Sequence, residues 1–227
     1  MFGMTTEGLV QAAILILIFL GVAFPFHEFA HAWAAYRLGD GTAKMYGRLS
    51  LNPAVHFDPL GGLLLAITAL SNSGFLLGWA KPTPVNPSNL RDRRNGEVLV
   101  AVAGPASNVL MAVAGAIAWR ILEAVGVIDL TTLEPSGPMF ILVSVLHSFV
   151  VVNIVLAVFN LIPIPPLDGS AVLFRVVSPA TAWQIRPVLA QYGSILLLVI
   201  IFAFVLTPLG RGLSQFINGI TNLLLGL

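Results

Sequence analysis

The stretch LVQAAILILIFLGVAFPFHEFAH, residues 9–31, decides how this chain is organised. It is an almost entirely apolar run of membrane-spanning length that ends directly in His27, Glu28 and His31. Two histidines four positions apart lie about one turn apart on one helix face, which suits two imidazole nitrogens binding one zinc ion. Ionisable residues at the end of a membrane span are costly to place there, so this cluster predicts a functional site.

The residues around the two histidines suggest further roles. Glu28 is rotated about 100° around the helix, close enough to take a proton from a metal-activated water without being a ligand. One helix is expected from Gly8 to about Tyr36, broken or kinked near Pro25, which lacks a backbone donor. That bend is either a tolerated kink, since proline is common in membrane helices, or a device that orients His27.

The composition is that of a polytopic membrane protein. The 227 residues are 57% hydrophobic and only 9% charged, with a mean hydropathy of +0.93, whereas soluble domains carry about 25% charged residues. The net charge of +1 and the lack of a basic stripe give no reason to expect nucleic acid. With no cysteine, a metal must be held by His, Asp or Glu. No basic segment precedes the apolar run, so we expect the first helix to be retained.

Hydropathy and charge predict an all-α polytopic membrane protein of about five or six transmembrane segments, forming one domain over 1–227 with a core at about 8–176. The apolar segment 60–77 has basic residues on both flanks, so a re-entrant element is expected there rather than a crossing. The same charge rule puts both histidines and Asp168 near the cytoplasmic face. The other expected spans are 97–120, 139–162 and 194–206. Segment 213–227 is either a last crossing or an interfacial helix. The C-terminal helices together are expected at about 188–227.

Asp168 is the leading candidate for the third zinc ligand. Catalytic zinc usually has three protein ligands and one open position. Asp168 lies in the proline-punctuated apolar segment NLIPIPPLDG, residues 160–169, where an unpaired carboxylate would be costly. Its alternative role is to cap the helix expected from Ser170 to Val176.

HEFAH beside a membrane span, together with NLIPIPPLDG, resembles the site-2 protease family of intramembrane zinc metalloproteases. GPASN at 104–108 is similar to the GPxxN segment of that family. Segments 52–59 and 78–82 resemble its short bacterial branch, which lacks a PDZ domain.

The resemblance implies one catalytic Zn²⁺ held by His27, His31 and Asp168, with Glu28 as general base. It also implies hydrolysis of peptide bonds within or near transmembrane segments of membrane-protein substrates, as in regulated intramembrane proteolysis. The expected partners are transmembrane-helix substrates and the lipid bilayer, and the oligomeric state stays open.

Three further polar residues are candidates for substrate binding. Asn108 follows a Gly-Pro break inside an apolar span, so its amide either binds an unwound substrate strand or makes an interhelical hydrogen bond. Asn153 has the same two possible roles, substrate binding or an interhelical hydrogen bond. His56, beside Asp58 in a loop, has either a gating or metal role or a structural hydrogen bond.

Two extended-looking stretches, Tyr46–Leu51 and Trp79–Val85, are predicted to pair as a small β-sheet near the active-site mouth. An exposed edge of that sheet would hold an unwound substrate by strand addition.

Two other functions use the same residues. A zinc-binding membrane transporter would pass the metal through this site and would not need Glu28, but it requires further ligands along a path across the bilayer. A non-catalytic relative would bind membrane helices, but it has no reason to keep a buried charged cluster.

Overall fold

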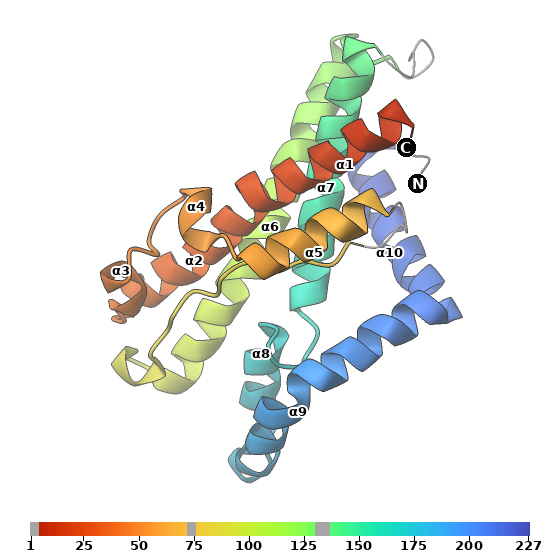
Figure 1. Ribbon diagram of the computed structural model, residues 1–227. Coiled ribbons are helices and arrows are strands. Elements are labelled where there is room, and N and C mark those ends of the chain that lie inside the picture. Colours follow the sequence, from red (N-terminus) through yellow and green to blue (C-terminus); the bar gives the residue numbers. More distant parts are fainter. Residues whose placement is uncertain (1–4, 72–75, 130–136) are drawn as a thin grey trace.

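The computed structural model describes residues 5–71, 76–129 and 137–227, and every regular element in these ranges is a helix (Figure 1). The elements follow in the order α1 (Thr6–Ile18), a π-helical turn (Phe19–Ala23), α2 (Phe24–Arg37), α3 (Thr42–Met45), α4 (Pro53–His56), α5 (Pro59–Leu70), a 3₁₀ turn (Pro87–Asn89), α6 (Arg93–Ala124), α7 (Pro138–Asn160), α8 (Gly169–Val176), α9 (Pro179–Leu206) and α10 (Pro208–Leu225).

The all-α membrane architecture is confirmed, but the predicted five or six transmembrane segments are too many. Within the described ranges, four helices are long and apolar enough to cross a membrane. α5 has 12 residues, which span about 18 Å of a hydrocarbon core of about 30 Å. α10 does not qualify either, because polar residues interrupt it. The four are Thr6–Arg37, Arg93–Ala124, Pro138–Asn160 and Pro179–Phe204.

The first span passes through Pro25 without a break. The N–H of Phe24 bonds to the carbonyl of Phe19, five residues back, so the preceding turn is π-helical. A proline ring clashes with the carbonyl four residues earlier in a regular α-helix, here that of Gly21. The widened turn makes room for the ring, and α2 carries the two histidines directly beyond it.

The segment after α5 runs back along that helix, while its re-entry into a membrane stays a prediction. The Leu77 N–H donates to the Thr68 hydroxyl at 3.0 Å. A Cβ on Gly61 would overlap the backbone of Trp79, so only glycine allows this close approach. Residues 72–75, in the middle of the expected element, lie outside the described residues.

The predicted β-sheet of Tyr46–Leu51 and Trp79–Val85 is wrong, since no strand occurs in the parts of the chain that the structure describes. The backbone donors of both stretches are used elsewhere. The N–H of Arg48 bonds to the Ala43 carbonyl at 2.8 Å, and that of Thr83 bonds to a side chain of α2. Prolines at 82 and 84 lack the N–H that a ladder requires.

Two apolar clusters hold the spans together. One joins α1 and the π-helical turn to α5 and α7, and the other joins α6 and α7 to α10. The apolar stretch of α9 is only 11% buried, and α9 packs mainly on α8 and α10 (Figure 1). One face of α9 lines a cavity that also contains the candidate site.

Candidate metal centre

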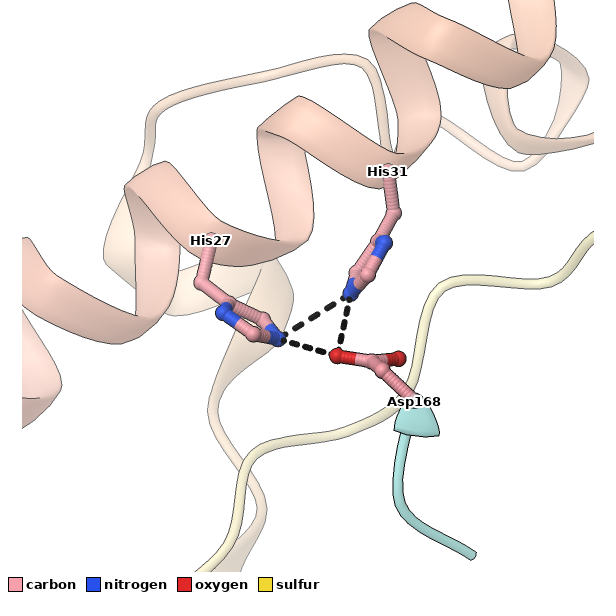
Figure 2. A group of neighbouring side chains, drawn as sticks. All are labelled: His27, His31 and Asp168. Carbon is pink, nitrogen blue, oxygen red and sulfur yellow. Dashed lines mark hydrogen bonds and ion pairs between the residues drawn. The ribbon is translucent and has the colours of Figure 1, made fainter. Parts of the chain in front are cut away.

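His27, His31 and Asp168 come together at one point (Figure 2). The two histidines extend from successive turns of α2 with their Nε2 atoms 3.0 Å apart. Oδ2 of Asp168, at the start of α8, lies 3.2 Å from Nε2 of His27 and 3.3 Å from that of His31. Both histidines are buried, so the three atoms form a compact donor set inside the protein.

The hydrogen bonds behind the rings fix the chemistry of these donors. Nδ1 of His27 donates to the side-chain oxygen of Asn108 at 2.6 Å, and Nδ1 of His31 donates to the Val100 carbonyl at 2.7 Å. With its proton on Nδ1, each ring, when neutral, offers the lone pair of Nε2 on the side that faces Asp168. Oδ2 of Asp168 is buried and has no hydrogen-bond partner among the described residues. Two lone pairs and a carboxylate oxygen facing one another fit a bound zinc ion with an open fourth position.

The structure does not show the capping role considered for Asp168, and its role as a zinc ligand stays a prediction. It occupies the N-cap position of α8, yet its side chain makes no capping hydrogen bond. The carboxylate points to the histidines instead (Figure 2). A Cβ on Gly169 would overlap the carbonyl of Leu161, so the glycine lets the chain fold back tightly and present Asp168.

Gly104 of α6 lies against both imidazole rings. A Cβ at this position would be 2.5 Å from Cε1 of His31 and 2.6 Å from Cε1 of His27. The lack of a side chain lets α6 approach α2 closely enough for the hydrogen bonds behind the rings. The sequence motif included Gly104, but its contact with the ligands was not predicted.

Glu28 is buried beside the donor set and is held by a loop. Its Oε2 accepts the N–H of Thr83 at 2.8 Å, and the Thr83 hydroxyl donates to the Glu28 carbonyl at 3.1 Å. Sequence reasoning missed this role of Thr83. A signal was present, because Thr83 carries the one backbone N–H in Pro82-Thr83-Pro84.

Asn108 and Asn153 lie behind His27. The Asn108 amide donates to the side-chain oxygen of Asn153 at 2.8 Å, and the Asn153 amide donates to the Phe149 carbonyl at 2.8 Å. Both asparagines are fully buried and neither lines the cavity described below. Their contact with substrate stays a prediction, while their interhelical hydrogen bonds are observed.

His56 is not brought to the metal centre. It is buried, its Nε2 lies 2.7 Å from the Ser50 carbonyl, and it does not line the cavity. Its backbone carbonyl accepts the N–H of Lys81 at 2.8 Å, which holds the loop that carries Thr83. The structure gives His56 a structural hydrogen bond, and its gating role stays a prediction.

A cavity of about 2090 Å³ opens onto the metal centre. His27, Glu28, His31 and Asp168 all line it. Its walls come from α1, α2, α5, α6, α7, α8, α9, α10 and the loop that follows α5. It is larger than the usual 300–1,000 Å³ of a small-molecule pocket, which suits a polypeptide segment.

Known proteins resemble the chain over most of its length. The profile of Peptidase family M50 matches residues 15–206. "Putative zinc metalloprotease YwhC" of Bacillus subtilis (strain 168) is 38% identical over 86% of this chain and 81% of its own. "Putative zinc metalloprotease Rip2" of Mycobacterium tuberculosis (strain ATCC 25618 / H37Rv) is 29% identical over 88% of this chain and 72% of its own. The protein of the same name from Mycolicibacterium smegmatis is 30% identical over 87% of this chain and 71% of its own. No solved structure gives a significant match.

Proposed function

Since the chain belongs to Peptidase family M50 and is a metalloprotease, we propose that it is an intramembrane zinc endopeptidase. Its substrates are membrane proteins, cut within or near their transmembrane segments. The observation that carries the proposal is the convergence of His27, His31 and Asp168 beside Glu28 at a buried cavity among apolar helices. A transporter would not need Glu28 held at this point, which favours hydrolysis.

His27, His31 and Asp168 would hold the zinc ion. When bound, zinc lowers the pKa of a water molecule towards about 7 and polarises the scissile carbonyl. Asn108 and the Val100 carbonyl keep both rings in the tautomer that offers Nε2. Such hydrogen bonds behind ligands orient the rings and raise their basicity.

Glu28 is the proposed general base. It accepts a proton from the attacking water and returns it to the leaving amine, which lets one carboxylate serve both halves of the reaction. The bond from the Thr83 N–H to Oε2 fixes the orientation of the Glu28 carboxylate. Oε1, which that bond does not use, is the proposed proton acceptor. The cavity supplies the route by which water reaches this buried group.

The substrate is expected to unwind locally at the site. Carbonyls in a helix are shielded by their own hydrogen bonds, and a strand with free backbone groups is tolerated at membrane depth only where protein or water covers it. The cavity gives that cover. Helix-breaking residues in the substrate should therefore favour cleavage.

The active site is proposed to face the cytoplasm. Basic residues gather at the end of the molecule where α6 begins and α8 ends: Arg94 donates to the Arg175 carbonyl at 3.2 Å, and Arg186 pairs with Glu97 at 3.0 Å. Excess Arg and Lys at one end of the spans marks the cytoplasmic side. Asp168 directly precedes α8 and so belongs to that half of the protein.

The test compares zinc content and cleavage of a model transmembrane substrate for the wild type and Glu28→Gln in detergent. The amide keeps the shape and the bond from Thr83 but cannot take a proton, so we expect retained zinc and abolished cleavage. Cleavage at the wild-type rate by Glu28→Gln would refute Glu28 as the base. Zinc content that is unchanged in a His27→Ala variant would refute the proposed ligand set.

A further inference from the structure

α10 presents a polar face to the cavity. Arg211, Ser214, Gln215 and Asn218 line it, with Arg211 and Gln215, and Ser214 and Asn218, each four residues apart. The apolar Leu213 and Ile217 line the cavity between them. The opposite face of the helix, which includes Ile220 and Leu224, packs against the cluster formed by α6 and α7. In a chain with 9% charged residues, a group of polar side chains along a large cavity points to a functional surface.

Arg211 lacks a counter-ion among the residues that the structure describes. The other arginine that lines the cavity, Arg186, is paired with Glu97 at 3.0 Å. The two remaining acids of the cavity wall belong to the active site. Arg211 is exposed and projects from the first turn of α10, so it is a free cation available to a molecule that enters the cavity.

The wall formed by α1 and α7 is polar as well. Gln11 donates to the hydroxyl of Ser148 at 2.9 Å, and both residues line the cavity together with His147. Gln11 precedes His27 by 16 residues on one continuous span, or about 24 Å at 1.5 Å per residue. The cavity thus has polar groups far from the metal centre, on two walls that are otherwise mostly apolar.

α9 completes the enclosure with an apolar wall. Ser194, Leu197, Leu198 and Ile201 follow one face of the helix along the cavity. A Cβ on Gly193 would lie 2.6 Å from the carbonyl of Pro165, so this part of α9 is close to the segment that carries Asp168. The cavity therefore offers an apolar surface near the metal and a cationic, polar surface beyond the end of α9.

We propose that Arg211 is a specificity-determining residue that binds a carboxylate side chain of the substrate's transmembrane segment. The inference rests on the proposed function and names a substrate class for the same cavity: segments that carry an Asp or Glu at a distance from the scissile bond. Arginine pairs with a carboxylate through two parallel hydrogen bonds, which are strong away from bulk water. Ser214, Gln215 and Asn218 lie on the same face as further polar partners.

We take the length of the α9 wall as the scale of the offset of that carboxylate. Gly193 lies against Pro165, and a Cβ on Gly210, next to Arg211, would overlap the carbonyl of Phe204. From Gly193 to Phe204 the cavity wall of α9 advances 11 residues, or about 16 Å. A substrate segment covers this distance with about five residues when extended and about eleven when helical. The acid should therefore lie about five to eleven residues from the cleaved bond.

The experiment uses charge reversal with the full-length protein in detergent. Leucine-rich model transmembrane segments carry one Glu, one Lys or only Leu, and the charged residue is moved through offsets of five to eleven on each side of the cleavage site. Binding to each segment is measured by photocrosslinking in a Glu28→Gln background with Arg211 retained, changed to Gln or changed to Glu. Cleavage is measured in parallel with an intact Glu28.

With Arg211 retained, we expect the Glu segment to bind about tenfold better than the Leu segment at one window of offsets. Arg211→Gln should abolish that preference, and Arg211→Glu should transfer it to the Lys segment at the same offsets. Equal binding of all segments to all three variants would overturn the inference. So would an effect of Arg211 confined to retention of anionic lipid, measured by native mass spectrometry, because Arg211 would then anchor a headgroup.

The two proposals fail separately. If the wild type cleaves no segment, the proposed function fails, while the binding series in the Glu28→Gln background still decides the role of Arg211. If the Leu segment is cut equally by the wild type and Arg211→Gln, the catalytic centre is intact and any difference with the Glu segment belongs to Arg211.

Discussion

Gly104→Ala should disable the metal centre through a single methyl group. The new Cβ would lie 2.5 Å from Cε1 of His31, about 0.9 Å short of the 3.4 Å at which ordinary contact begins. The strain cannot be relieved by moving α6 away alone, because α6 also supplies the oxygens that hold both rings, those of Val100 and Asn108. Either the rings rotate or these hydrogen bonds lengthen.

A displacement of about 1 Å at a catalytic centre costs about 100-fold in rate, and loss of a hydrogen bond behind a ligand costs about 10–100-fold in metal affinity or activity. We therefore expect Gly104→Ala to lose zinc to a competing chelator at least tenfold more readily and to cleave about 100-fold more slowly.

The matched control is Gly219→Ala, a helical glycine of α10 whose added Cβ meets nothing within 4 Å. It should keep the zinc content and cleavage rate of the wild type. Thermal unfolding in detergent checks that both variants are folded. Wild-type zinc retention and cleavage by folded Gly104→Ala would show that α6 does not limit the position of the histidines, and the packing argument would be wrong.

Two further predictions concern residues on either side of the centre. Asn108→Ala removes the acceptor that orients His27 and should lower zinc affinity about 10–100-fold, as measured by chelator competition. Asn153→Ala should have a smaller effect, because Asn153 makes no hydrogen bond to either histidine. Equal losses of affinity would contradict this order. Although burial alone would raise the pKa of Asp40, hydrogen bonds from Thr42, Asn89 and Asn86 hold it below its usual range. The stability that the Asp40 carboxylate contributes should be present above about pH 4 and lost as the pH falls through its lowered pKa. The difference in melting temperature between the wild type and Asp40→Asn should therefore shrink between pH 5 and pH 3. A constant difference would refute the assignment.

The convergence of His27, His31 and Asp168 could be predicted because much of its signal is local. His27 and His31 are one helical turn apart, and the absence of cysteine leaves few partners, of which Asp168 lies in a segment too irregular to bury a free carboxylate. The structure brings these three side chains together. Their role as zinc ligands is still the proposal that the metal measurements test.

The errors and omissions arise where backbone groups decide the outcome. Trp79–Val85 reads as a strand, yet its prolines leave few N–H groups, and that of Thr83 goes to Glu28. The Val100 carbonyl that orients His31 has no side-chain signature at all. The predicted number of spans was too high because α5 is too short to cross a membrane and polar residues interrupt α10.

The register of two helices explains why the centre needs α6. Val100, Gly104 and Asn108 are four residues apart on one face of α6, and they meet His31, both rings and His27 in that order. The two helices therefore run antiparallel here, and the one-turn spacing of the histidines is matched by the one-turn spacing of their supports. A slip of one turn would place the glycine opposite only one ring and a side chain opposite the other. The short motif of α6 thus acts with the histidine motif of α2 as one unit. A substitution in either motif should first lower the affinity for the metal.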